Sequence, residues 1–356
     1  MHFLTSIKAK AISAGLLPKR HKKPPKPEPN ILPPLIPTEL PHILPEHSFA
    51  LSDQGWTKLT FDRPVDPLQT SSQALFEASK VFFDLPAEKK HEFKTRAGTE
   101  EGWNHVPGEK EFITLRSLER VPMELRDAAS AFWDVAGGLL DDLVRRVAES
   151  LGLPPDALGV YSEPCRKLGV EKTATLLRLF RYESSSSETE MKTVAEAHRD
   201  LGLISLVIGD TPGLEVWNRT SQYWFSIEKT FSEPAGSLMV GRQLERLSNS
   251  RYQSGGHRVV SYPAPTLDSQ SKTTRRYRYS IVFVLRAHEP VPVSTDQLTT
   301  KITGTFANTI SGTAGELYRE IHRAHFNINT GIEERNRQRE VLAARKGQEE
   351  QLNLKA

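Results

Sequence analysis

The sequence predicts a mainly β domain with flanking helices, of the α+β class, with an antiparallel sandwich or jelly-roll core. Two observations support this prediction. Between residues 174 and 285, short apolar runs alternate with polar turns, and no helices separate them as they would in a parallel sheet. Before this region, residues 122–153 have the apolar spacing of a long helix that packs against a sheet.

Composition narrows the class of protein. With 356 residues, of which 37% are hydrophobic, the chain is long enough for one large globular domain or two small ones. Its single cysteine, Cys165, cannot form an internal disulfide or a thiolate metal cluster, which fits a reducing compartment. No apolar run approaches the roughly 20 residues that cross a bilayer. We therefore expect no membrane span and a cytoplasmic location.

Residues 1–46 are expected to form a disordered, proline-rich, basic arm. Ten of the 24 prolines fall in the first 45 residues, and residues 1–30 carry a net charge of +6. The remainder has a net charge of −3, so the folded part is not a basic nucleic-acid surface. A solvated tail is the leading interpretation of the arm, and a targeting segment or a contact with an acidic surface is the alternative.

Residues 47–165 are expected to form a helical amino-terminal region with short strands. The pattern predicts a strand at 55–59, a helix at 71–84, and a loop followed by a strand across 98–116. The helix over 122–153 has a continuous apolar stripe, which we interpret as a packing face. The stripe consists of Phe132, Ala136, Leu139, Leu143, Val147 and Leu151.

Residues 166–290 are expected to form the β core, and residues 291–356 to form carboxy-terminal helices packed on its outside. The short apolar runs of the core region are bounded by turn residues, as strands are. These expected strands span residues 175–182, 198–208, 214–218, 223–227, 237–240, 257–260 and 277–285.

A candidate metal site begins with His198 and Asp200. In an extended backbone, residues i and i+2 project to one face, so these two side chains can converge on one ion. His257 opens an apolar strand after a glycine pair and supplies a third ligand. Two imidazoles and one carboxylate hold ferrous iron on one face and leave coordination positions open, whereas a closed structural zinc site usually includes cysteine.

A candidate anion site lies further along the chain. Arg278 and Ser280 share one face of the last apolar strand, and a buried guanidinium there needs an anion such as a carboxylate. On the strand at 175–182, alternation puts Arg178, Phe180 and Tyr182 on one side. Tyr182 can donate its hydroxyl to the same small dicarboxylate.

Together these motifs resemble the isopenicillin N synthase-like family of iron(II)- and 2-oxoglutarate-dependent oxygenases. Supporting segments, such as Phe83-Asp84-Leu85-Pro86 and Gly213-Leu214-Glu215-Val216, extend the resemblance over most of residues 50–330. The resemblance implies a double-stranded β-helix, the cupin-like jelly roll, with flanking helices. It also implies that His198, Asp200 and His257 bind Fe(II), and that Arg278, Ser280 and Tyr182 bind 2-oxoglutarate.

Two features depart from the family pattern. Phe180 stands where the family often has asparagine, two residues before Tyr182. His257 and Arg278 are 21 residues apart, a longer separation than the family usually shows, and residues 263–274 read as an inserted loop.

The expected function is that of a dioxygenase that uses Fe(II), 2-oxoglutarate and O2 to hydroxylate, desaturate or cyclise a small organic molecule, in specialised metabolism. The resemblance places Ile113, Leu115, Arg178, Phe180 and Val284 in the substrate pocket. Arg178 is interpreted either as a carboxylate or phenolate binder or as part of an internal ion pair. Two alternatives stay open, an iron oxidase that does not consume 2-oxoglutarate and an inactive metal-binding module. No nucleic-acid partner is expected, and the sequence does not set the oligomeric state.

Overall fold

The computed structural model describes residues 40–44, 51–61, 65–169, 172–184, 190–262 and 277–353. Two antiparallel sheets dominate this part of the chain. The strands of the larger sheet are β1 (Trp56–Thr60), β2 (Gly102–Val106), β3 (Lys110–Leu115), β4 (Leu176–Glu183), β6 (Ile204–Gly209), β9 (Ala235–Val240) and β11 (Tyr277–Leu285). Those of the smaller sheet are β5 (Lys192–His198), β7 (Leu214–Asn218), β8 (Tyr223–Phe225) and β10 (His257–Ser261).

The strand order brings distant segments side by side. The seven-stranded sheet has the order β1-β9-β6-β11-β4-β3-β2, and the four-stranded sheet has the order β5-β10-β7-β8. In the larger sheet, β11 pairs with β4 on one side and with β6 on the other. In the smaller sheet, β10 lies between β5 and β7. These antiparallel crossovers between non-consecutive strands are those of a jelly roll.

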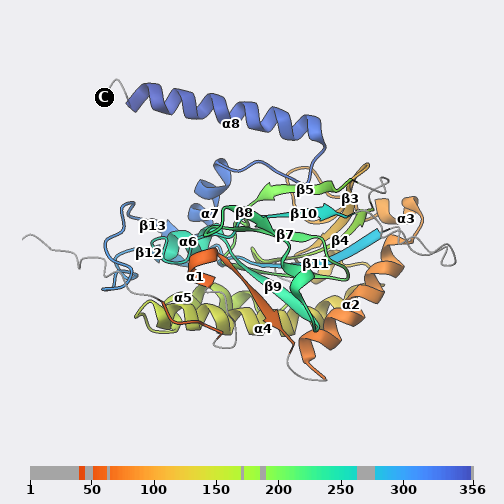
Figure 1. The fold of residues 1–356 in the computed structure, drawn as a ribbon, viewed down its shortest axis with the longest axis horizontal. Coiled ribbons are helices and arrows are strands. Elements are labelled where there is room, and N and C mark those ends of the chain that lie inside the picture. The colour runs from red at the N-terminus through yellow and green to blue at the C-terminus, as the bar shows by residue number, and fades with distance from the viewer. Residues whose placement is uncertain are drawn as a thin grey trace, which may run out of the picture. The chain divides into compact units, whose positions relative to one another are not determined.

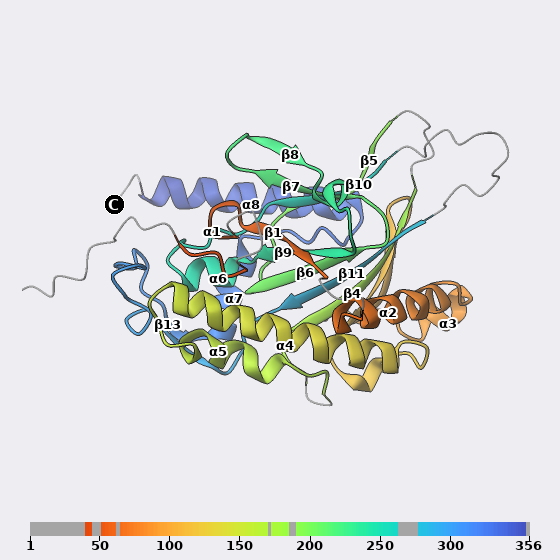
Figure 2. The same ribbon diagram turned by 60° about the horizontal axis from the view of Figure 1, so that its bottom comes forward.

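Helices cover the face of the large sheet that turns away from the small sheet (Figure 1). The α-helices of the described residues are α1 (Leu51–Gln54), α2 (Pro67–Phe83), α3 (Ala87–His91), α4 (Arg126–Ser150), α5 (Asp156–Ser162), α6 (Arg242–Leu247), α7 (Ala314–Arg323) and α8 (Ile332–Asn353). Figure 2 shows α2, α4 and α5 lying together below the sheet. Asp66 caps α2 by accepting from two backbone amides of its first turn, and α4 packs Trp133 edge-on against Phe283 of β11.

The large sheet separates two apolar cores because its strands alternate. Leu177 and Leu179 of β4 and Phe283 of β11 point toward the helices. Phe180 and Tyr182 of β4 point the other way, into a second core between the two sheets. This second core encloses the candidate site.

Several expected elements match the structure. The strands at 214–218 and 277–285 and the helices around residues 71–84 and 122–153 are present at or near the expected bounds. The strand expected at 198–208 is wrong as one element, because β5 ends at His198 and β6 begins at Ile204. The earlier part of β5 gave no apolar signal, since β5 lies at the edge of its sheet and is partly exposed.

Two other segments differ from the expectation. Residues 98–116 hold a hairpin of two strands, β2 and β3, with Gly108 at φ 75° in its turn. Residues 291–356 contain β12 (Pro292–Ser294) and β13 (Ser311–Thr313) before the helices α7 and α8. Thr313 and Glu316 form a capping box that starts α7.

Residues 1–39 and 45–46 of the expected arm, and the whole of the expected loop at 263–274, lie outside the described residues. At the end of the expected arm, Leu40, Ile43 and Leu44 are buried in the core on the helix side, so the packed part of the chain includes residues before 46. In the part of the chain that the structure describes, no helix combines the length and hydropathy needed to cross a membrane.

Candidate metal and cosubstrate site

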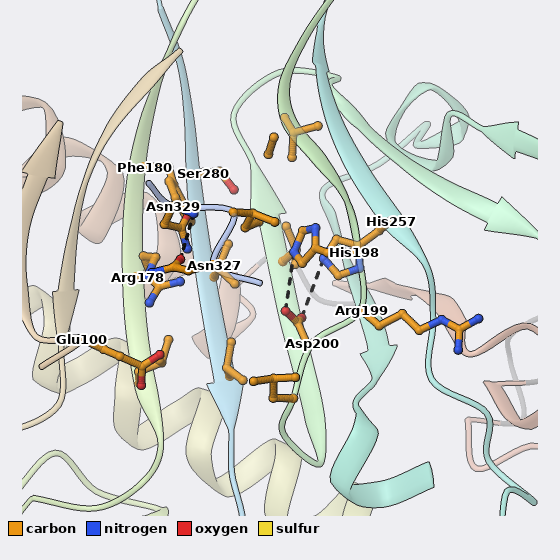
Figure 3. Close-up of a pocket in the computed structure, with 18 of the residues that line it drawn as sticks. Glu100, Arg178, Phe180, His198, Arg199, Asp200, His257, Ser280, Asn327 and Asn329 are labelled. Atoms are coloured by element: carbon orange, nitrogen blue, oxygen red, sulfur yellow. Dashed lines mark hydrogen bonds and ion pairs between the residues drawn. The ribbon is translucent and has the colours of Figure 1, made fainter. Parts of the chain in front are cut away.

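Three side chains form a potential metal-binding cluster between the sheets. His198, the last residue of β5, pairs directly with His257, the first residue of β10. Asp200 follows His198 in the turn that leads to β6, and not on a continuous strand as the sequence suggested. The potential ligand atoms of the three residues all lie within 4.8 Å of one another. Figure 3 shows both imidazoles converging on the carboxylate.

Distances and orientation suit a single ion. His198 Nε2 lies 3.8 Å from Asp200 Oδ1, and His257 Nε2 lies 3.8 Å from Asp200 Oδ2. Each Nδ1 faces a backbone carbonyl, at 2.8 Å from Glu196 for His198 and at 3.3 Å from Gly255 for His257. A carbonyl only accepts, so Nδ1 carries the hydrogen and the Nε2 lone pair of each ring points at the carboxylate.

Electrostatics keep these groups in the forms that bind a cation. Burial, with repulsion from His257, lowers the pKa of His198 well below its usual value, so the imidazole is neutral. Burial acts to raise the pKa of Asp200, but attraction to His257 and His198 outweighs it and holds that pKa below its usual value. Asp200 Oδ2 is buried and has no hydrogen-bond partner among the described residues. An unpartnered buried carboxylate oxygen facing two imidazole lone pairs fits a divalent metal ion.

Three hydrogen-bond donors without partners lie near this cluster. Tyr182 and Ser280 line the same cavity as the two histidines, on strands β4 and β11, and their hydroxyls bond to no described residue. Arg278 is paired with Tyr182 across these strands, and its buried Nη1 also has no partner in the described part of the chain. Burial raises the pKa of Tyr182, which therefore keeps its hydroxyl hydrogen. These donors fit a carboxylate ligand such as 2-oxoglutarate.

The rest of the Arg278 guanidinium is held by the protein. Its Nε donates to the carbonyl of Thr211 at 2.8 Å, and its Nη2 lies 3.0 Å from both carboxylate oxygens of Glu228. Glu228 is buried and also accepts from the backbone amides of Gly213 and Leu214, both at 2.7 Å. Sequence reasoning missed Glu228, because it lies 50 residues from Arg278 in a segment without a motif.

The expected pocket residues divide into two groups. Arg178, Phe180 and Val284 line a cavity of about 140 Å³ beside the metal cluster. Ile113 and Leu115 do not, and the prediction for them is wrong. They belong to the core on the helix side of the sheet, whereas their neighbours Phe112 and Thr114 face the same side as Phe180 and Arg178. Strand β3 is buried on both faces, so its sequence gave no alternation from which to choose a side.

The cavity has walls that the sequence did not indicate. Glu100 precedes β2, Arg286 follows β11, and residues from 322 to 329 come from the end of α7 and the segment before α8. In that segment the lining residues are His322, His325, Asn327, Ile328 and Asn329. Local patterns carry no signal for these residues, because only the tertiary fold brings them to the cavity.

Residues 174–287 match the family model of the 2OG-Fe(II) oxygenase superfamily. The similarity to this superfamily therefore covers the segment that holds the core strands β4 to β11 and the candidate site. Its members use Fe(II), 2-oxoglutarate and O2, and the matched segment holds all six predicted metal and cosubstrate residues. The narrower assignment to the isopenicillin N synthase-like family stays a prediction.

Two relatives of this chain carry names of the same kind. The 2-oxoglutarate-dependent dioxygenase 19 of Oryza sativa subsp. japonica is 30% identical over 208 residues, which cover 53% of this chain and 57% of that protein. The 2-oxoglutarate-dependent dioxygenase traH of Penicillium crustosum is 25% identical over 230 residues, which cover 54% and 66%. The chain therefore spans less than two thirds of the length of these relatives.

Solved structures of similar fold confirm the architecture of this chain. A full-length protein of Neurospora crassa, crystallised in complex with alpha-KG and 5-formyluracil, superimposes with a TM-score of 0.61 at 21% identity, covering 76% of this chain and 86% of that one. The dioxygenase for auxin oxidation of rice superimposes with a TM-score of 0.57 at 19% identity, covering 77% and 86%.

Proposed function

We propose that the protein is an iron(II)- and 2-oxoglutarate-dependent dioxygenase that oxidises a small organic molecule. One observation carries this proposal. Two imidazole lone pairs and an unpartnered carboxylate oxygen converge in a cavity that also holds the hydroxyls of Tyr182 and Ser280, which bond to no described residue. The superfamily match supports the same conclusion.

The cluster residues would hold the ion on one side only. His198 and His257 offer Nε2 atoms whose orientation is fixed by backbone carbonyls, and Asp200 brings the negative charge. Three protein ligands leave further positions for other ligands. Bound iron(II) and 2-oxoglutarate supply the activation of dioxygen that oxidises a C–H bond.

Tyr182, Ser280 and Arg278 would bind the distal carboxylate of 2-oxoglutarate. The two hydroxyls line the cavity, and the buried Arg278 Nη1 has no partner among the described residues, so binding a carboxylate would remove the free-energy cost of leaving Nη1 unsatisfied. Glu228 neutralises the Arg278 charge. We therefore expect the affinity for 2-oxoglutarate to depend on the fixed positions of these donors as much as on net charge.

The remaining walls would shield the reacting atoms from water. Apolar side chains from β4, β6, β7 and β11 surround the cluster, and they limit the substrate to a small molecule. These side chains are Leu176, Val207, Leu214, Val282 and Val284. Hydroxylation, desaturation and cyclisation are all compatible with this arrangement. We expect a role in specialised metabolism and a reducing compartment such as the cytoplasm, since the one cysteine, Cys165, is buried and free.

Succinate formation tests the proposal. Protein supplied with Fe(II), 2-oxoglutarate and oxygen, together with a panel of small acids and phenols, should release succinate, and omission of any of the three should abolish the release. An iron-dependent product without succinate would favour an oxidase that does not consume 2-oxoglutarate. Iron binding without any turnover would favour an inactive metal-binding module.

A further inference from the structure

Arg178 is a cation in the cavity without an ionic partner among the described residues. It projects from β4 on the same face as Phe180 and Tyr182, and its Nε donates to the Thr114 hydroxyl at 2.8 Å. The guanidinium carbon lies 5.5 Å from the ring centre of Phe112 and 6.0 Å from that of Phe180. These contacts fix the side chain, and its terminal nitrogens bond to no described residue. The internal ion pair considered from the sequence is therefore absent from the described structure.

The acidic groups nearest Arg178 already have other partners. Glu100 lines the same cavity, but Arg286 donates to both of its oxygens, at 2.5 and 3.1 Å. Burial acts to raise the pKa of Glu100, but the attraction of Arg286 outweighs it and lowers that pKa to about 2. Asp200 belongs to the metal cluster. With Asp200 engaged by iron and Glu100 by Arg286, the charge of Arg178 has no ion-pair partner among the described residues.

Polar side chains lie near Arg178 in the cavity, as expected of a site that binds the polar end of a molecule. Asn327 and Asn329 line the cavity, and Asn329 Oδ1 is buried without a hydrogen-bond partner in the described chain. Figure 3 shows Arg178 and these asparagines grouped on one side, with the metal cluster across the cavity. Leu176 and Val284 are apolar residues that line the same cavity. A polar group fixed at one end of a mostly apolar cavity sets the orientation of a ligand.

We propose that the substrate of this oxygenase carries a carboxylate that binds the terminal nitrogens of Arg178, while its apolar part faces the metal cluster. The proposal rests on the proposed function. An arginine presents a planar fork of donors that matches a carboxylate, and charge-assisted hydrogen bonds in a largely buried site are roughly twice as strong as neutral ones. The site is distinct from the 2-oxoglutarate donors, because Arg178 and Arg278 stand opposite different residues on paired strands.

Matched pairs of acids and amides test the proposal. Protein loaded with Mn(II) and saturating 2-oxoglutarate, without oxygen, is titrated calorimetrically with phenylacetate, 3-phenylpropanoate and hexanoate, and with the primary amide of each. At least one acid should bind about ten-fold or more tightly than its amide. Arg178→Gln should remove this preference. Arg199→Gln is the matched control, because Arg199 lines the cavity but points away from the metal cluster in Figure 3.

Each result has a defined meaning. Equal binding of acids and amides, no binding of any acid, or a preference that persists in Arg178→Gln would overturn the carboxylate proposal. The affinity for 2-oxoglutarate is measured separately on the same Mn(II)-loaded samples. If 2-oxoglutarate binds and the acid preference is absent, only the substrate proposal fails, whereas absence of 2-oxoglutarate binding sinks the proposed function itself. Thermal unfolding of Arg178→Gln confirms that the variant is folded.

Discussion

Glu228 lies with both carboxylate oxygens 3.0 Å from Nη2 of Arg278, and both side chains are buried. The ion pair fixes the guanidinium so that only Nη1 lacks a partner among the described residues. Glu228 thus acts on the proposed cosubstrate site through Arg278, as a positioning residue. The folded state therefore depends on the Arg278 charge, because the buried Glu228 carboxylate needs a cation beside it.

Breaking this pair should destabilise the protein. Arg278→Met leaves the Glu228 carboxylate buried without its cation, which costs about 3–5 kcal/mol in the free energy of unfolding. The double variant Arg278→Met/Glu228→Gln removes both charges and should be destabilised by less than the sum of the two single changes. Chemical denaturation of the four proteins measures this coupling. Additive effects would show that the pair contributes no coupling energy.

The same substitution should weaken cosubstrate binding. Arg278→Met should raise the concentration of 2-oxoglutarate needed for half-saturation by roughly ten-fold or more, because it removes a charge-assisted donor. Binding to the Mn(II)-loaded protein is measured at a temperature where the variant remains folded. An unchanged requirement would remove Arg278 from the 2-oxoglutarate site.

The packing of Arg278 against Glu228 should require a glycine at position 209. A Cβ placed there would overlap Arg278 Nη2 and Glu228 Oε1. Gly209→Ala should therefore displace the guanidinium and weaken 2-oxoglutarate binding. Gly138→Ala is the control, because its nearest neighbour would be 3.8 Å away, at the end of the Arg166 side chain. In α4 this control should be neutral or stabilise by about 0.5–1 kcal/mol. Equal affinities in the two variants would contradict the assignment.

The sequence predicted the His-Asp-His cluster and much of the sheet, but only part of the cavity lining. The cluster of His198, Asp200 and His257 was predictable because two histidines and a carboxylate at this spacing are typical of an iron site. Strand β11 was predictable because polar and apolar residues alternate at its start and an apolar run follows. Ile113 and Leu115 were misplaced because β3 is buried on both faces. Neither Glu228 nor the segment around Asn329 could be found, since their positions depend on contacts between parts of the chain far apart in sequence.

Stability should rise with pH because of Lys110. Burial lowers the pKa of this fully buried lysine to about 7, against an ordinary value of 10.5, and Arg335 and Arg178 add to the effect while Glu109 opposes it. Between these two values the unfolded chain binds a proton that the folded chain does not, so the free energy of unfolding increases with pH. Above about pH 10 the buried tyrosines act in the opposite direction, since the pKa values of Tyr161 and Tyr252 are raised to about 12.

Chemical denaturation from about pH 6.5 to about pH 9.5 measures this effect across the window in which the folded and unfolded chains differ in bound protons. The wild type should gain stability across the range, and Lys110→Met should gain much less. Lys89→Met is the control, because Lys89 is an exposed lysine on α3. A rise of equal size in the Lys110 and Lys89 variants would exclude Lys110 as its cause.

Loss of a metal ligand should abolish metal binding without unfolding the protein. Asp200→Ala should abolish iron binding and succinate formation while retaining the folded structure, because it removes the one anionic ligand of the cluster. Asp142→Ala, at an exposed position of α4, should change neither. Iron content after dialysis and circular dichroism provide the two measurements. Full iron content in the Asp200 variant would refute its role as a ligand.

The most direct test of the central claim is visible absorption of the anaerobic protein. Iron(II) held by His198, Asp200 and His257, with 2-oxoglutarate bound beside Tyr182 and Ser280, should give a weak metal-to-ligand charge-transfer band. The band should require both additions, saturate at one iron per chain, and be absent in Asp200→Ala. A protein that is folded and yet shows no band at any concentration of iron and 2-oxoglutarate would contradict the account.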